Sequence, residues 1–344
     1  MKVSFLVTYY NQCQYVKKSL DSILAIKKDF EWEILVGDDG STDGTIDVVK
    51  DYVEKHPKNI FLNIMPREAG KKYSSVKRAS ANRLALLERM TGDAFCILDG
   101  DDWFCDYTFV NDAVKVFDAN EEVSIVAFGF KYVRNDIDGK QIVLPDKFNN
   151  SIVETSIYLR RFYIHAGACV YRKSFAKNRI EYIKGIGFFD DNDIVINSLN
   201  YGNMFYIKKV VYAYRQTGVS VYTSMDRLEQ AILNVQGYDV DLKLIDEEHV
   251  EALQKRYASH IILTYLCKND LETRIGTEKY NRYLEECKCI DESLTYKLLK
   301  YNDISNVDRL MCDYIFSEVV KANKKTFVKM FLKYIKMRAK SLMH

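Results

Sequence analysis

Alternating strand and helix patterns constrain the first hundred residues more than any other feature of this sequence. Short apolar runs rich in β-branched residues recur at 3–7, 33–37, 60–64 and 94–98. Stretches with apolar residues at helical spacing separate them, at 15–26, 43–56 and 76–90. Strands that alternate with helices of this length predict βαβ units, a mostly parallel sheet and right-handed crossovers. We therefore expect an α/β fold of the Rossmann-like kind, with helices flanking a central sheet.

Polar segments follow three of these strands. They are Thr8–Asn11, Asp38–Asp39 and Asp99–Asp102. Open α/β sheets bind ligands beyond the carboxyl ends of their strands, where the strand order changes direction. We therefore expect these three segments to converge, although they are far apart in the sequence.

The pattern changes further along the chain. A hairpin is predicted from strands at 123–133 and 140–144 around a glycine-containing turn at 135–139, and further strands are expected at 166–171 and 204–208. Beyond residue 223 the spacing is helical almost throughout, at 225–245, 247–268, 277–287 and 307–343. We predict an α/β domain over residues 1–222 and a helical C-terminal region over 223–344.

Composition narrows the class of protein. Of the 344 residues, 48% are apolar and 28% charged, and the net charge of +2 gives no general signal for binding nucleic acid. The eight cysteines include no CxxC pair, which favours reduced thiols in a cytoplasmic protein. No signal peptide is expected, because the chain begins directly with a strand pattern. No apolar run approaches the roughly 20 residues that span a bilayer.

Asp99 and Asp101 stand two residues apart after a buried strand, with Gly100 between them. Two carboxylates on one turn repel each other unless a cation neutralises them. Oxygen ligands at this spacing suit Mn²⁺ or Mg²⁺, whereas the simpler interpretation is a solvated acidic turn. The sequence lacks both glycine-rich phosphate loops, GxGxxG and GxxxxGK[ST], so a metal would have to bind a diphosphate.

Four ordered motifs together carry a resemblance to a known family. They are Val-Ser-Phe-Leu-Val-Thr-Tyr-Tyr-Asn at 3–11, Glu-Ile-Leu-Val-Gly-Asp-Asp-Gly-Ser-Thr-Asp-Gly-Thr at 33–45, Gly-Asp-Ala-Phe-Cys-Ile-Leu-Asp-Gly-Asp-Asp at 92–102, and Phe-Phe-Asp-Asp-Asn-Asp-Ile at 188–194 followed by 211–215. In this order and spacing they resemble the family 2 glycosyltransferases with a GT-A fold. The resemblance covers about residues 1–220. It implies a nucleotide-sugar half at about 1–105 and an acceptor half at about 106–222.

The resemblance implies an inverting, hexosyltransferase-type transfer from a nucleotide-diphospho-sugar, of which a UDP-sugar is the expected donor. Thr8, Tyr10 and Asp39 would hold the uridine. Asp101, with Asp99 beside it, would hold Mn²⁺ or Mg²⁺ and through it the diphosphate. Asp102 is the weakest candidate for a ligand.

The resemblance also assigns the catalytic base to Asp191, which would deprotonate the acceptor hydroxyl. Asp190 and Asp193 are its rivals, and the alternative for the whole group is capping of the helix that follows. His165 opens a strand-like segment that in relatives lies near the acceptor, unless it is simply a buried histidine. Trp103 is either a platform for a sugar ring or a packed side chain.

The segment 67–83 is more basic than is usual in the family. Diphosphate contacts are therefore expected from this segment, with a solvated surface charge as the alternative at each position. The candidates are Arg67, Lys71, Lys72 and Arg78.

The tail at 321–344 is basic and amphipathic. It predicts either contact with an anionic membrane surface or a packed helix with a solvated basic rim. With a glycan or lipid-linked glycan as acceptor, the first interpretation places the protein in the cytoplasm, peripheral on the inner face of the membrane, in the synthesis of bacterial surface polysaccharides or glycoconjugates. The alternatives are a non-catalytic module that binds nucleotide sugars or glycans, and a sugar nucleotidyltransferase.

Overall fold

The computed structural model describes most of the chain up to residue 300. The described residues are 1–68, 70–71, 73–173, 181, 183–185, 188–217, 225–267, 271–288, 290 and 293–300. Lys72 and the predicted basic tail at 321–344 lie outside them. The chain divides into two compact units, one of residues 1–224 and 240–256 and one of residues 225–239 and 257–344. The predicted boundary after residue 222 stays a prediction.

The first half of the α/β unit is a series of parallel strands and crossover helices. Its elements are β1 (Lys2–Tyr9), α1 (Cys13–Leu24), β2 (Glu31–Asp38), α2 (Thr45–Lys55), β3 (Ile60–Ile64), α3 (Ser75–Arg89) and β4 (Ala94–Asp99). Strands β1, β2 and β4 are almost wholly buried, as expected of a parallel sheet covered by helices. The predicted strands and helices of this half are confirmed.

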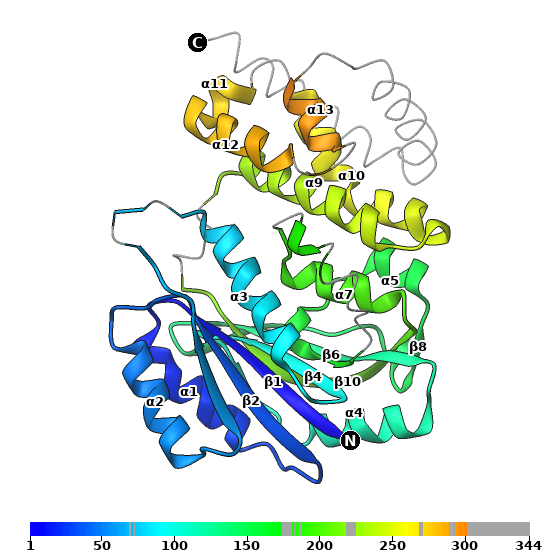
Figure 1. Ribbon diagram of the computed structural model, residues 1–344. Helices are drawn as coiled ribbons and strands as arrows, with labels where there is room; N and C mark the ends of the chain where they lie inside the picture. The colour runs from blue at the N-terminus through cyan, green and yellow to red at the C-terminus, as the bar shows by residue number, and fades with distance from the viewer. Residues whose placement is uncertain are drawn as a thin grey trace. The chain divides into compact units, whose positions relative to one another are not determined.

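The strand order β3-β2-β1-β4 explains where the crossover helices lie. The chain moves from β1 to β2 to β3 in one direction and then returns to β4 on the far side of β1. Because crossovers are right-handed, α1 and α2 cover one face of the sheet and α3 the other (Figure 1). The direction changes between β1 and β4, which is the point where open sheets bind ligands.

The second half of the unit extends the sheet with antiparallel as well as parallel pairings. Its elements are β5 (Trp103–Phe104), α4 (Phe109–Ala119), β6 (Val123–Arg134), β7 (Ile137–Ile142), the 3₁₀ turn η1 (Asp146–Phe148), β8 (Ser151–Val153), α5 (Thr155–Arg161), the 3₁₀ turn η2 (Ala166–Ala168), β9 (Cys169–Arg172), α7 (Asp191–Leu199) and β10 (Asn203–Arg215). The sheet continues from β4 in the order β9-β6-β10-β5, with β7 on β6 and β8 on β10. Strand β9 runs antiparallel to both neighbours, whereas β6 and β10 are parallel to each other. The predicted α/β sheet is therefore confirmed as a mixed sheet. The pairings among β1, β2, β3 and β4 are parallel, as predicted, whereas most pairings of the second half are antiparallel.

Local features differ from expectation where side chains or turns compete with the strand pattern. In the β6–β7 hairpin the turn falls on Asn135 and Asp136, whose φ angles are 51° and 57°, and Gly139 lies within β7. Two residues at positive φ form the short turn that matches the twist of a hairpin. His165 does not open a strand. It precedes η2, and β9 begins only at Cys169.

The predicted helical C-terminal region is confirmed over its described residues. It contains α9 (Arg227–Leu244), η3 (Glu247–His249), α10 (Val250–Leu266), α11 (Leu271–Ile275), α12 (Thr277–Cys287) and α13 (Leu294–Lys300). In the second unit, the buried Asp239 accepts hydrogen bonds from the Ser293 hydroxyl at 2.6 Å and from the backbone of Leu294 at 2.8 Å. This carboxylate therefore caps α13. Among the described helices, none has the length and apolar character needed to cross a bilayer.

Candidate active site

The carboxyl ends of β1, β2 and β4 meet at the point where the strand order reverses. Thr8 is paired with Gly37 on one side and with Asp99 on the other. The Thr8 hydroxyl donates a hydrogen bond of 3.4 Å to Asp99 Oδ1, and the Gly100 N–H donates to the Thr8 carbonyl at 3.0 Å. The polar segments that follow these strands therefore converge, as the sequence predicts.

Asp39, directly after β2, is buried and paired with two arginines. Arg78 Nε donates to Asp39 Oδ1 at 2.5 Å, and Arg67 forms an ion pair with the other carboxylate oxygen. Arg67 Nε also donates to the Asp39 carbonyl at 2.7 Å. The Arg67 guanidinium lies 4.0 Å from the ring centre of Tyr10, and Tyr10 is 45% exposed. Tyr10, Asp39 and Arg67 thus form one group, to which the structure adds Arg78.

The basic residues of the segment 67–83 do not share one environment. Arg67 and Arg78 form ion pairs with Asp39, whereas Lys71 is exposed and forms an ion pair with Glu68 at 3.0 Å. Lys71 therefore has the character of a surface charge.

The turn between β4 and β5 requires glycine at its second position. A Cβ on Gly100 would lie 2.1 Å from Tyr9 Cδ1 and 2.5 Å from Gln12 Oε1. Only a residue without a side chain allows this approach. The glycine thereby fixes where the neighbouring carboxylates of Asp99 and Asp101 stand.

Asp101 carries an unfavourable charge in the absence of a cation. Burial, together with the charge of Asp99, raises the pKa of Asp101 to about 6. The Asp99 side chain is more open, with 38% of it exposed. A bound divalent cation would remove this cost, because it favours the ionised form of both carboxylates.

Asp102 has a different role from its two neighbours. It is 1% exposed, and its carboxylate accepts the Tyr212 hydroxyl at 2.6 Å and the Arg215 N–H at 2.7 Å. Arg215 Nε in turn donates to the Asp101 carbonyl at 2.8 Å. These bonds attach the acidic turn to β10. Burial and the charge of Asp101 raise the pKa of Asp102 well above its ordinary value.

Arg83 is a site residue that the sequence did not single out. Its side chain is 12% exposed, its guanidinium lies 3.7 Å from Asp99 Oδ1, and its Nη1 donates to the Phe189 carbonyl at 3.2 Å. Although burial opposes its charge, the carboxylates of Asp99 and Asp191 raise the pKa of Arg83. Arg83 therefore joins the acidic turn to the segment that precedes α7. Its position in the basic segment 67–83 was the available signal.

The acidic group at the start of α7 divides into capping residues and one open carboxylate. Asp190 Oδ1 accepts the N–H of Asn192 at 2.8 Å and of Asp193 at 3.1 Å. Asp193 Oδ2 accepts the Asp190 N–H at 2.7 Å, which completes a capping box. Asp191 lies in the first turn with 30% of its side chain exposed. Its carboxylate remains accessible to a ligand.

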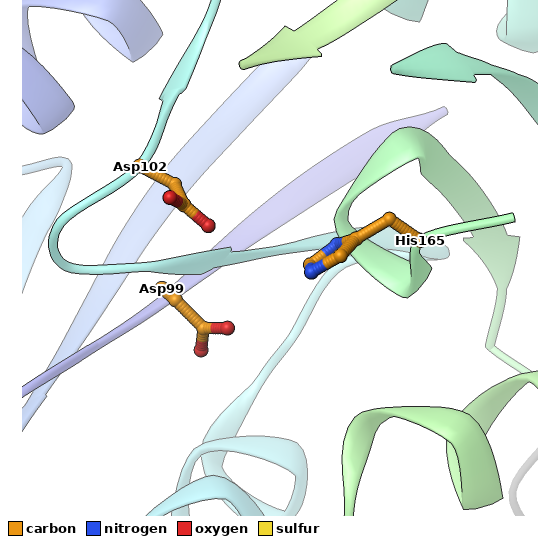
Figure 2. A group of neighbouring side chains, drawn as sticks. All are labelled: Asp99, Asp102 and His165. Atoms are coloured by element: carbon orange, nitrogen blue, oxygen red, sulfur yellow. The ribbon is translucent and has the colours of Figure 1, made fainter. Parts of the chain in front are cut away.

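A possible metal site lies beside the acidic turn. Asp99, Asp102 and His165 each place one potential ligand atom within 4.8 Å of the others. Figure 2 shows the imidazole of His165 directed toward the two carboxylates, which come from either side of the β4–β5 turn. Carboxylate oxygens suit Mg²⁺ or Mn²⁺, and the raised pKa of Asp101 indicates a charge that a cation would offset. The carboxylates of the acidic turn therefore fit a divalent cation without selecting one metal.

Trp103, directly after the acidic turn, is packed between cations. Lys18 Nζ lies 3.6 Å and the Arg215 guanidinium 4.7 Å from its ring centres. Both cations also contact Asp136 at 3.1 Å. This arrangement favours the packing interpretation over a platform for a sugar ring.

Solved structures with a similar fold define the structural class. TarS from Staphylococcus aureus, residues 1–349, in complex with UDP-GlcNAc superposes with a TM-score of 0.56 at 18% identity, over 92% of this chain and 93% of that one. The UDP complex of the same protein gives a TM-score of 0.55 at 19% identity, over 92% of each chain. At this identity the similarity concerns the fold alone. The predicted GT-A fold is confirmed.

The family follows from the sequence. Residues 4–179, just over half of the chain, match the model of glycosyl transferase family 2, and the chain belongs to that family. An uncharacterised protein of Mycobacterium tuberculosis is 24% identical over 171 residues, which are 50% of this chain and 47% of the relative. An uncharacterised glycosyltransferase of Mycoplasma genitalium is 34% identical over 105 residues, 30% of this chain and 33% of the relative. The matched region thus spans half or less of the length of these relatives.

Proposed function

We propose that this protein is a metal-dependent inverting glycosyltransferase that moves a hexose from a UDP-sugar to a hydroxyl of a glycan or lipid-linked glycan. The observation that carries the proposal is the meeting of two acidic groups from distant parts of the chain. Arg83 lies 3.7 Å from Asp99 and also contacts the segment before α7, while His165 lies 4.0 Å from Asp191. A donor bound at the acidic turn would therefore lie beside the Asp191 carboxylate.

The donor end of this site is the group formed by Tyr10, Asp39 and Arg67. Each carboxylate oxygen has two lone pairs, so Asp39 can accept the N3–H of uracil while its arginines stay in place. The exposed Tyr10 ring and the Thr8 hydroxyl complete the contacts available to the uridine. The binding of UDP and UDP-GlcNAc by TarS supports a UDP-sugar as donor.

The diphosphate would lie at the acidic turn. Asp99 and Asp101 would hold Mn²⁺ or Mg²⁺, which when bound offsets the charge that develops on the leaving diphosphate. Arg83 adds a fixed positive charge beside Asp99. Asp102 holds the turn on β10 through its bonds to Tyr212 and Arg215.

Asp191 would act as the general base. Its carboxylate takes the proton of the acceptor hydroxyl as the acceptor oxygen forms a bond to the anomeric carbon. The bond from that carbon to the diphosphate oxygen breaks on the opposite face, so UDP leaves and the configuration inverts. Asp190 is less suited to this step, because its carboxylate already accepts two backbone N–H groups of α7.

The division into a nucleotide-sugar half at about 1–105, an acceptor half at about 106–222 and a C-terminal region forms part of this proposal. A role in bacterial surface polysaccharide or glycoconjugate synthesis would place the protein in the cytoplasm. Contact of the tail at 321–344 with the inner face of the membrane stays a prediction from sequence.

The test is a panel of UDP-sugars with Mn²⁺, with UDP release as the readout. We expect turnover with at least one donor, and Asp191→Asn is expected to lower kcat by about 10²–10⁴-fold, the usual contribution of a general base. Asp190→Ala, the matched control, removes a helix cap and is expected to cost about 1 kcal/mol of stability while donor binding persists. UDP binding without turnover would favour the non-catalytic module, and release of pyrophosphate would favour a nucleotidyltransferase. Wild-type transfer by Asp191→Asn would refute the assignment of the base.

A further inference from the structure

Packing against three aromatic rings and a backbone hydrogen bond fix the orientation of the His165 ring. It is 5% exposed and stacks on Tyr212, with ring centres 4.6 Å apart and an interplanar angle of 22°. Tyr214 and Phe130 contact the ring at 4.9 Å and 5.7 Å. Its Nδ1 accepts the Gly167 N–H at 3.1 Å as the cap of η2. This ring therefore has one nitrogen committed to the backbone and one directed into the site.

The bond from Gly167 determines which nitrogen of His165 carries the proton. An atom that accepts an N–H bond holds a free lone pair, so Nδ1 is unprotonated and the neutral ring carries its hydrogen on Nε2. Nε2 is thus a hydrogen-bond donor, and it lies 4.0 Å from Asp191 Oδ2.

The same tautomer argues against His165 as a metal ligand. Ligation through Nε2 requires a lone pair there and a proton on Nδ1, and that proton would face the Gly167 N–H. His165 lies beside Asp99 and Asp102, but the atom that it presents is a donor. Asp99 already forms an ion pair with the Arg83 guanidinium at 3.7 Å. Asp102 already accepts the Tyr212 hydroxyl and the Arg215 N–H. Among the carboxylates near His165 in the described part of the chain, Asp191 is therefore the partner left for its Nε2–H.

We propose that His165 is a positioning residue for Asp191, to which it donates Nε2–H so that the second carboxylate oxygen faces the acceptor hydroxyl. This inference rests on the proposed function. Asp191 is 30% exposed, so a rotation of its side chain can shorten the 4.0 Å separation to hydrogen-bond length. Catalytic hydrogen bonds are commonly long before the substrate binds and tighten in the complex.

Two substitutions separate this role from a structural one. His165→Asn keeps an oxygen at the position of Nδ1, which can still accept the Gly167 N–H, and removes the donor that faces Asp191. His165→Gln places an amide N–H near the position of Nε2 and removes the acceptor for Gly167. A structural role predicts that the first variant is the more active, whereas the positioning role predicts the reverse order.

The experiment measures kcat, the KM of the donor and the melting temperature for wild type and both variants. We expect His165→Asn to lose on the order of 10- to 100-fold in kcat, less than the loss of the base itself, with the KM of the donor unchanged. His165→Gln is expected to recover most of kcat while melting about 2–4 °C lower. Wild-type kcat in His165→Asn, or a raised KM for the donor with unchanged kcat, would overturn the proposal.

A second measurement does not depend on turnover. Nitrogen-15 spectra of the histidine rings report the tautomer directly, and His165→Asn identifies the signal of this residue. We expect the Nε2–H tautomer, unchanged when Mg²⁺ and UDP are added. An Nδ1–H tautomer, or a switch to it with Mg²⁺, would refute the positioning role even if no donor were turned over. Absence of turnover alone would count against the proposed function, and the spectra would still decide the role of His165.

Discussion

Replacing Asp101 by asparagine is expected to stabilise the metal-free protein and to abolish sugar transfer. Burial and the charge of Asp99 raise the pKa of Asp101 from 3.8 to about 6. Because the pKa is higher in the folded than in the unfolded chain, the unfolded chain loses this proton first as the pH rises. The free energy of unfolding therefore falls between about pH 4 and pH 6 and stays lower above that range.

The size of the effect follows from the shift. One pKa unit corresponds to about 1.4 kcal/mol, so a shift of about two units costs about 3 kcal/mol once Asp101 is ionised. Asparagine has a similar shape and no charge, so it avoids this cost. In a unit of this size about 3 kcal/mol corresponds to a rise of about 6–12 °C in melting temperature.

The assay is thermal unfolding in the presence of a chelator, from about pH 4 to pH 8. Across the lower half of this range the wild-type curve should decline more steeply than the Asp101→Asn curve, because both proteins retain Asp102, whose pKa burial also raises. Asp51→Asn, a substitution at an exposed position on α2, is the matched control and should follow the wild type. Addition of Mn²⁺ and UDP should stabilise the wild type and the control but leave Asp101→Asn unchanged.

Two results would refute the reasoning. Equal melting temperatures for wild type and Asp101→Asn at about pH 7.5 without metal would mean that the carboxylate carries no cost of ionisation. Transfer activity in Asp101→Asn would mean that Asp101 is not needed to hold a metal.

Two further predictions concern buried carboxylates that support the fold. Glu33 is 3% exposed, and although burial opposes ionisation, its hydrogen bonds, one of them from the Ser4 hydroxyl at 2.6 Å, lower its pKa to about 2. Glu33→Gln should therefore lose about 2–3 kcal/mol of stability at neutral pH in urea unfolding, and the difference should vanish as the pH falls from about 4.5 to about 2. Asp102→Ala should cost about 2–5 kcal/mol in the same assay, because the Tyr212 hydroxyl and the Arg215 N–H lose their acceptor, whereas Asp102→Asn should retain most of the stability. Equal stability of the two Asp102 variants would contradict this account.

The sequence predicts the sheet and the convergence of the site because both follow from topology. The strand and helix periods imply βαβ units, and the ends of parallel strands must share an edge. Thr8 and Asp99 therefore meet, although 90 residues separate them. No side-chain geometry was needed for that prediction.

The position of Arg83 and the tautomer of His165 could not be predicted from the sequence, for a physical reason. The direction of Arg83 depends on how α3 packs over the sheet, and nothing in the sequence of the segment 67–83 distinguishes it from the other basic residues there. The role of His165 depends on η2, because the bond from the Gly167 N–H sets its tautomer. A strand pattern was expected there, and in a strand this bond would not form.

The acidic residues of this site divide by the hydrogen bonds that they already accept. Asp102 accepts a tyrosine hydroxyl and a backbone N–H, and Asp190 accepts two N–H groups of α7. Through these hydrogen bonds, Asp102 holds a turn and Asp190 caps the start of a helix. Asp99 and Asp191 remain partly exposed, at 38% and 30% of their side chains. Asp191 follows directly after Asp190, and Asp99 lies three residues before Asp102. Each exposed carboxylate is thus close in sequence to a carboxylate that fixes the local backbone. The two acids of each motif therefore have separate roles. One of them fixes the backbone of the loop, and that backbone sets the position of the other carboxylate.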